Sequence, residues 1–262
     1  MAGGKDGIDR GAFEGDELEG KCVVVIGGSM GIGRATAELV LRQGAKVVLT
    51  SRDQARAAKA AGELAAATGS NKIVPAAIEI TRRAEVEAFL ASHAKFDHLI
   101  LPGAHAHRLD FAKLDEKLAR ESFDTKVWGP FLAAYDGRRH MNRGGSIVFY
   151  SGAASRRPLK GYVVGAAIDG AIDAATRALA WEMAAEGIRV NCISPGIIDT
   201  DVVRRGRTEE EYRKIRQSHA ERVPLNRLGT AMECAQGALY LMICGFVTGE
   251  VLAIDGGAEA SP

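Results

Sequence analysis

The most constraining segment of the sequence is residues 23–40, VVVIGGSMGIGRATAELV, where an apolar run leads directly into glycines and then into a helix-forming stretch. The glycines are Gly27, Gly31 and Gly33. A glycine-rich turn lets backbone N–H groups approach a pyrophosphate, and the helix that follows offers unpaired N–H donors and a partial positive charge. This order of strand, turn and helix predicts a dinucleotide-phosphate site.

Short apolar runs alternate with longer alanine-rich stretches along the rest of the chain. Most of the runs are continuous in valine, isoleucine and leucine, which is typical of strands buried on both faces. They occupy residues 21–26, 46–50, 72–78, 97–101, 146–150, 189–193 and 250–254. Repeated strand–helix–strand units favour right-handed crossovers. The pattern therefore predicts an α/β fold, a Rossmann-type doubly wound parallel sheet of about seven strands with helices on both faces.

The composition and net charge of the chain argue against some classes of binding partner. The sequence has 34 Lys and Arg against 33 Asp and Glu, a formal net charge of +1, so we expect neither a nucleic-acid nor a membrane partner. The four cysteines show no CxxC spacing, which predicts reduced thiols in a cytoplasmic protein and no metal site. We expect residues 1–17, which hold no apolar signal core, to form a flexible tail before a single dinucleotide-binding domain at residues 18–262.

Residues 199–227 depart from the alternating pattern because they are dense in charge. One interpretation is a solvated helix with pairs at i,i+4, Glu209 with Arg213 and Glu210 with Lys214. The other is a lid over the strand ends that covers the substrate, since long insertions in compact domains usually serve a function.

The chain resembles the short-chain dehydrogenase/reductase family from residue 18 to residue 257. Besides the glycine turn, the resemblance rests on Glu79-Ile80-Thr81, on RVNCISPGIIDT at 189–200 and on TGEVLAIDGG at 248–257. It implies a nicotinamide cofactor, a small-molecule substrate and oxidoreductase activity. Alanine-rich helices near 116–135 and 169–186 resemble the family's dimer surfaces, so we expect a homodimer or homotetramer.

The end of the second predicted strand indicates which nucleotide is used. NAD-preferring sites place a carboxylate there to accept the ribose 2′-OH. Here the strand ends Thr50-Ser51-Arg52, and Arg52 could instead bind a 2′-phosphate while Ser51 donates a hydroxyl. We therefore expect NADP(H) to be preferred over NAD(H), although Arg52 could simply cap a helix.

The residues expected to bind the cofactor come from the glycine turn, the strand ends and the segments that match the family. They are Gly27, Ser29, Met30, Gly31, Ile32, Gly33, Ser51, Arg52, Glu79, Ile80, Pro102, Gly103, Lys126, Pro195, Gly196, Ile198 and Thr200.

The resemblance weakens at the catalytic positions. The family uses a Ser, a Tyr that acts as acid or base, a Lys four residues later and a supporting Asn. An ungapped alignment places these at Gly152, Gly165, Asp169 and Lys126. The turn after the fourth strand, Asn-Asn-Ala-Gly in the family, reads LPGA at residues 101–104.

Other residues nearby could supply the chemistry. Tyr162 precedes Gly165 by one helical turn and could occupy the space that a glycine leaves. Since a buried charge without a partner is costly, we predict a Lys126–Asp169 ion pair beside the nicotinamide ribose. His105 and His107 follow the fourth strand, where ligands bind in open α/β sheets. The catalytic candidates are Tyr162, His107, Lys126 and Asp169.

Three functions stay open at this stage. The first is an NADP(H)-dependent oxidoreductase that acts on a carbonyl or alcohol through a non-standard site. The second is a catalytically silent NADP(H)-binding sensor or scaffold, and the third is a lyase or isomerase on the same fold.

Overall fold

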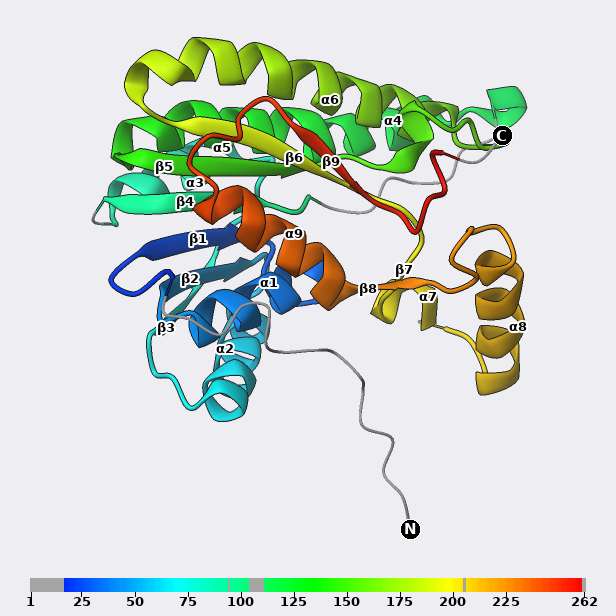
Figure 1. Ribbon diagram of the computed structural model, residues 1–262, viewed down its shortest axis with the longest axis horizontal. Helices are drawn as coiled ribbons and strands as arrows, with labels where there is room; N and C mark the ends of the chain where they lie inside the picture. Colours follow the sequence, from blue (N-terminus) through cyan, green and yellow to red (C-terminus); the bar gives the residue numbers. More distant parts are fainter. Residues whose placement is uncertain (1–16, 94, 104–110, 205, 261–262) are drawn as a thin grey trace.

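The strand that leads into the glycine turn lies inside the sheet, with a parallel neighbour on each side. A computed structural model describes residues 17–93, 95–103, 111–204 and 206–260. Its main sheet has seven strands in the order β3-β2-β1-β4-β5-β6-β9. All neighbouring pairs in this sheet are parallel. The predicted doubly wound parallel sheet is confirmed, and its order reverses between β1 and β4 (Figure 1).

The strands lie close to their predicted positions. They are β1 (Cys22–Ile26), β2 (Lys46–Ser51), β3 (Ile73–Ala77), β4 (Phe96–Leu101), β5 (Met141–Tyr150), β6 (Arg189–Pro195) and β9 (Val251–Ile254). The largest difference is the start of β5, at Met141 instead of the predicted 146. Met141 pairs with Phe96 before a register shift, and the glycines that follow Met141 conceal this extension in the sequence. A separate pair, β7 (Ile198–Asp199) and β8 (Gly229–Thr230), is too short to predict.

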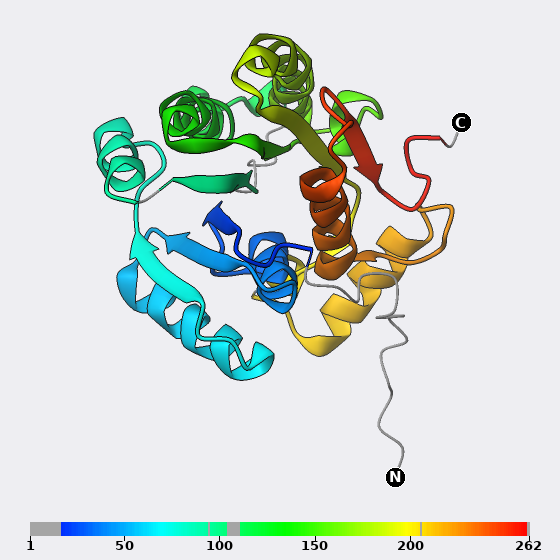
Figure 2. The same cartoon turned by 60° about the vertical axis from the view of Figure 1, so that its left-hand side comes forward.

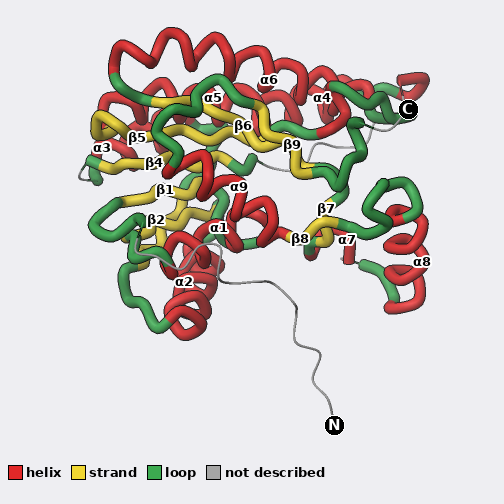
Figure 3. The backbone as a smooth tube through the Cα atoms, viewed as in Figure 1, coloured by secondary structure: helices red, strands yellow, loops and turns green. Residues whose placement is uncertain are grey.

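Helices cover both faces of the sheet, as Figures 1 and 2 show from two directions. One layer holds α3 (Arg83–Ala91), α4 (Glu116–Phe123), α5 (Gly129–Gly137) and α6 (Val163–Met183). The other holds α1 (Gly31–Arg42), α2 (Gln54–Thr68) and α9 (Ala231–Ile243). The short α7 (Asp201–Arg204) and α8 (Glu209–Ala220) follow β7 and lie beyond one end of the sheet (Figure 3). None of the described helices is long and apolar enough to cross a membrane.

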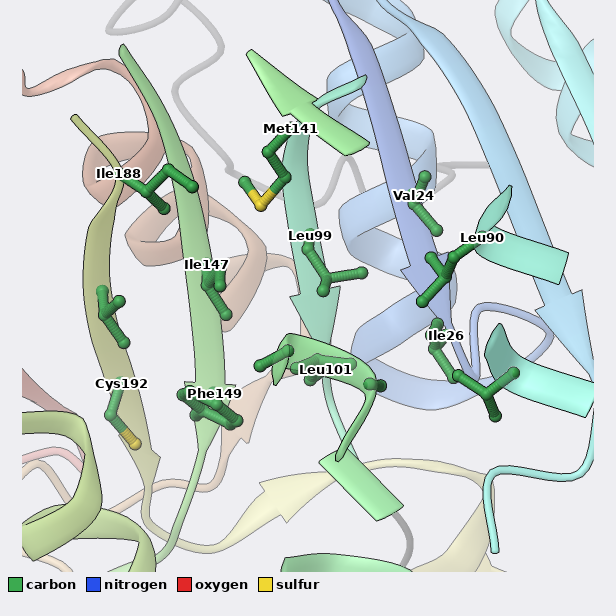
Figure 4. Close-up of a cluster of buried hydrophobic side chains, with 14 of the residues drawn as sticks. Val24, Ile26, Leu90, Leu99, Leu101, Met141, Ile147, Phe149, Ile188 and Cys192 are labelled. Carbon is green, nitrogen blue, oxygen red and sulfur yellow. The ribbon is translucent and has the colours of Figure 1, made fainter. Parts of the chain in front are cut away.

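The apolar runs are continuous because most of the strands bury both of their faces, whereas the edge strands β3 and β9 are partly exposed. Successive side chains of β1 alternate between two clusters. Val23 and Val25 pack toward α1, α2 and α9, whereas Val24 and Ile26 pack with Leu99 and its neighbours toward the other layer (Figure 4). Because the core is sealed on both sides, polar groups that face a ligand are left to the carboxyl ends of the strands.

Candidate active site

The glycine turn is built so that its backbone is closely packed and exposed to a ligand. Gly27 and Gly31 have φ values of 97° and 54°, in the left-handed region that favours glycine. A Cβ on Gly33 would lie 2.4 Å from the carbonyl oxygen of Gly27 and 3.1 Å from Cγ of Pro102. The turn is attached to β2, because the N–H of Gly27 donates to Oγ1 of Thr50 at 3.2 Å. Only glycines satisfy this geometry, and α1 begins within the turn, at Gly31.

The end of β2 presents hydroxyls beside this turn. Ser51 is buried, and its Oγ lies 3.3 Å from Oγ of Ser29. Arg52 is exposed. The cap of α2 is Asp53, which accepts from the N–H of Arg56 at 2.7 Å, so the structure does not use Arg52 as the helix cap.

Other predicted cofactor residues gather at the same edge of the sheet. Cγ2 of Thr200 would lie 3.8 Å from a Cβ on Gly31, so the end of β7 is adjacent to the glycine turn. A Cβ on Gly103 would contact the Lys126 side chain at 3.5 Å. Glu79 accepts from the hydroxyl and N–H of Thr81 at 3.2 and 3.3 Å, which occupies one oxygen of its carboxylate within the turn. Geometry thus brings together segments that are far apart in the sequence.

Lys126 lies on an irregular helical turn. Residues Asp124–Trp128 form a π turn that connects α4 to α5. Pro130, which has no N–H to donate, follows in the first turn of α5. Single π turns within helices are frequently found at functional sites.

The predicted Lys126–Asp169 ion pair is present. Nζ of Lys126 lies 3.5 Å from Oδ1 of Asp169, and the side chains are only 12% and 6% exposed. The same ammonium donates to the carbonyl oxygen of Ser151 at 3.3 Å. Burial raises the pKa of Asp169 above its usual value, and the charge of Lys126 opposes this increase. The ammonium of Lys126 and the carboxylate of Asp169 therefore form an ion pair that is largely shielded from solvent.

Two glycines make room for the neighbouring side chains. A Cβ on Gly152 would lie 2.7 Å from Oδ2 of Asp169, so a serine at this position would collide with the carboxylate. A Cβ on Gly165 would lie 2.4 Å from the ring of Tyr162. Tyr162 immediately precedes α6 and is its N-cap, not a helical residue. Its ring nevertheless lies over the turn of α6 that contains Gly165, as the spacing of the two residues predicts.

The two histidine candidates, His105 and His107, lie outside the described residues. Cys192, one of the four cysteines, is buried, which raises the pKa of its thiol to about 12 and makes it a poor nucleophile. Among the described residues, no group of His, Cys, Asp and Glu could hold a metal ion.

Sequence reasoning missed a second charged cluster on α6. Asp173 accepts from Nη1 of Arg156 at 3.0 Å. The same guanidinium lies against the carboxylate of Glu259 near the C-terminus, with an Nη2–Oε1 distance of 2.8 Å. The four-residue spacing of Asp169 and Asp173 in an alanine-rich helix was the one available signal.

The charged insertion is anchored to the strand end by Asp199. Both carboxylate oxygens accept from the hydroxyl of Tyr212 on α8 at 2.7 Å, and Arg216 lies 3.3 Å away. The predicted Glu210–Lys214 pair is present at 2.7 Å. The predicted Glu209–Arg213 pair is wrong. Among the described residues Glu209 pairs with Arg204 at 3.6 Å, because α7 brings Arg204 to the start of α8.

Comparison with known proteins identifies the family. Residues 27–259 match the profile of a family described as enoyl-(acyl carrier protein) reductase. A short-chain dehydrogenase/reductase of Stachybotrys chlorohalonatus is 32% identical over 252 residues, which cover 92% of this chain and 98% of that protein.

Solved structures agree with this assignment. A small-chain dehydrogenase in complex with NADPH superposes with a TM-score of 0.78 at 32% identity, covering 92% of this chain and 99% of that one. A short-chain oxidoreductase of Pseudomonas aeruginosa PAO1, described as containing an atypical catalytic center, superposes with a TM-score of 0.85 at 25% identity, covering 92% and 97%. The chain therefore belongs to the short-chain dehydrogenase/reductase family of oxidoreductases.

Proposed function

We propose that the protein is an NADP(H)-dependent oxidoreductase that acts on a carbonyl or alcohol group of a small molecule through a site organised around Lys126 and Asp169. The observation that carries the proposal is the shielded Lys126–Asp169 pair, 3.5 Å apart, at the same sheet edge as a closely packed glycine turn. A buried ion pair is costly to assemble, and its position beside the turn indicates use with a bound nucleotide.

The residues at this edge fit a dinucleotide. Gly27 is exposed and a Cβ there would meet nothing within 4 Å, so the backbone of the turn is open to a pyrophosphate on this side. The hydroxyls of Ser29 and Ser51, 3.3 Å apart, and the exposed Arg52 suit a 2′-phosphate. A relative whose structure holds NADPH supports this choice. We assign the other predicted cofactor residues to the same site.

In the proposed mechanism the nicotinamide supplies or accepts the hydride when it is bound. With the cofactor bound, Asp169 would accept hydrogen bonds from the hydroxyls of the adjoining ribose. Lys126 keeps that carboxylate ionised and ties it to the carbonyl of Ser151. Tyr162, whose ring lies over Gly165, is the proposed proton donor or acceptor, and His107 is the second candidate for that role.

The substrate is expected to have an apolar part. A hollow of about 340 Å³ adjoins Tyr162, and its walls include Phe111, Pro158 and Leu159. We propose that residues 199–227, anchored through Asp199 and Tyr212, form the lid over this side. A cytoplasmic location stays a prediction.

Turnover tests the proposal. The wild-type protein should bind NADPH at least tenfold more tightly than NADH, since about 1.4 kcal/mol from one charge-assisted contact gives that ratio. It should also oxidise NADPH with members of a panel of apolar ketones and aldehydes. Tyr162→Phe should lower kcat by at least about 100-fold with little change in NADPH affinity, whereas the exposed Tyr240→Phe serves as the matched control.

Two outcomes would count against this reading. NADPH binding without turnover across the panel favours a sensor, a scaffold or a non-redox enzyme. A Tyr162→Phe variant with unchanged kcat would transfer the proton-transfer role to His107, which His107→Ala then tests.

We also propose that the α4–α6 layer contacts a second copy of the chain. Trp181 and Trp128 are 87% and 55% exposed, and large exposed aromatic side chains are enriched at interfaces. Light scattering at micromolar concentration should give the mass of a dimer or tetramer. A monomer, or an assembly that Trp181→Glu leaves intact, would contradict the proposal.

A further inference from the structure

Asp169 is not the only buried carboxylate on its face of α6. Asp173 follows one helical turn later and is 5% exposed. Its Oδ2 accepts from Oγ of Ser155 at 2.8 Å and from Nη1 of Arg156 at 3.0 Å. Its Oδ1 is buried and has no hydrogen-bond partner among the described residues. Asp173 therefore depends on a small number of contacts, and Arg156 provides its opposite charge.

Arg156 is held in place from its other side. Its Nε and Nη2 donate to the carboxylate of Glu259 at 2.5 and 2.8 Å. Glu259 in turn accepts from Oγ of Ser194, at the end of β6, at 3.1 Å. The guanidinium is thus fixed between the active-site helix and the C-terminal segment, although its side chain is 33% exposed.

The charge of Asp173 acts on Asp169. A like charge one helical turn away disfavours the ionised form of Asp169, and so does burial. The charged and titratable groups around Asp169 are Lys126, Asp173 and Arg156, with the neutral thiol of Cys192 behind Asp173. Lys126 is the ion-pair partner of Asp169 and Arg156 is that of Asp173, so neutralisation of Asp173 by Arg156 decides how much repulsion Asp169 experiences.

We infer that Arg156 is a positioning residue that keeps Asp169 ionised by neutralising Asp173. The effect of Arg156 on nucleotide binding rests on the proposed function, because the ionised form of Asp169 is the one that accepts hydrogen bonds from a ribose. The charges of Arg156, Asp173 and Asp169 are arranged in this way without a nucleotide. An experiment can therefore contradict the role of Arg156 without contradicting the proposed function, and the reverse.

Direct titration of Asp169 provides the test. In protein labelled with ¹³C at aspartate side-chain carbons, carboxyl shifts are followed against pH without nucleotide, and Asp169→Asn identifies the resonance. Arg156→Met should raise the titration midpoint of Asp169 by roughly half a pH unit or more, a value reduced for solvent screening at a partly exposed cation. Adding Asp173→Asn to Arg156→Met should lower the midpoint again.

Glu259→Gln is the matched control, because it removes the other partner of Arg156 and leaves Asp173 paired. It should not raise the midpoint. If Arg156→Met fails to fold, the double variant and Asp173→Asn still decide the question, since each should titrate at or below the wild-type midpoint. The inference is overturned if Arg156→Met leaves the midpoint unchanged, or if Glu259→Gln raises it equally.

A second measurement connects the charge to binding. NADPH affinity should fall as pH drops through the midpoint of Asp169, and Arg156→Met should move this fall to higher pH by the same interval. Absence of NADPH binding in the wild type would contradict the proposed function, while the carboxyl titration would still confirm or overturn the role of Arg156.

Discussion

Lys126→Met is expected to lower the free energy of unfolding by about 3–5 kcal/mol near neutral pH, the cost of leaving a buried charge without its partner. The carboxylate it abandons is only 6% exposed, so water cannot replace the ammonium. The hydrogen bond to the carbonyl of Ser151 is lost as well. Urea unfolding at several pH values measures the effect.

The stability lost in Lys126→Met should increase as pH rises. Without Lys126, the pKa of Asp169 in the folded protein rises further above its value in the unfolded chain, about 3.9. The folded state then holds a proton that the unfolded state has released, so stability falls as pH rises from about 4 to the raised pKa. The variant should consequently be less destabilised at pH 5 than at pH 8.

Two variants make this prediction specific. Lys126→Met combined with Asp169→Leu should recover most of the lost stability, because no charge is left buried. Lys117→Met is the control, since Lys117 is 85% exposed and lies 4.0 Å from Glu121, and it should change stability by less than about 1 kcal/mol. A single variant as stable as the wild type at pH 8 would show that the pair is not a buried charge pair.

Gly33→Ala is expected to abolish tight nucleotide binding, with a loss of at least about 100-fold in NADPH affinity. The added Cβ would lie 2.4 Å from the carbonyl oxygen of Gly27, and backbone on both sides of the turn would have to separate. Displacement of the turn removes the N–H groups that approach a pyrophosphate. Overpacking of this kind should also lower stability by about 1–3 kcal/mol.

Gly62→Ala is a matched control for the same substitution. Gly62 lies inside α2, and a Cβ there meets nothing within 4 Å. It should leave NADPH affinity unchanged and raise stability by about 0.5–1 kcal/mol, because alanine loses less backbone freedom in a helix. Equal NADPH affinities for Gly33→Ala and the wild type, measured by nicotinamide fluorescence, would exclude the glycine turn as the phosphate site.

The layers of the fold could be predicted because their signals are local. Continuous apolar strands and alanine-rich helices reflect burial on both faces. Within the turn, Gly27 and Gly31 are favoured by their positive φ, and Gly33 is required by its contact with the Gly27 carbonyl. The Lys126–Asp169 pair was predictable from the family resemblance. Both residues align with catalytic positions of the family, and a charge buried at one of these positions needs a partner.

The rest of the site depends on tertiary contacts that leave no local signal. Arg156 contacts Glu259 across 103 positions of sequence, and nothing near either residue indicates the other. The π turn at Lys126 has no periodicity of its own. The partner of Glu209 changed because α7 places Arg204 beside it. The choice of substrate also depends on tertiary contacts between loops. The apolar hollow beside Tyr162 indicates a substrate with an apolar part.

A crystal structure of the wild-type protein with NADPH would show whether the Lys126–Asp169 pair belongs to the cofactor site. We expect the pyrophosphate on the turn at Gly27–Gly33 and a hydroxyl of the nicotinamide ribose about 2.7–3.0 Å from a carboxylate oxygen of Asp169, with Lys126 still paired to it. A nicotinamide ribose bound away from Asp169, with the Lys126–Asp169 pair unchanged and remote from the cofactor, would rule out the proposed site.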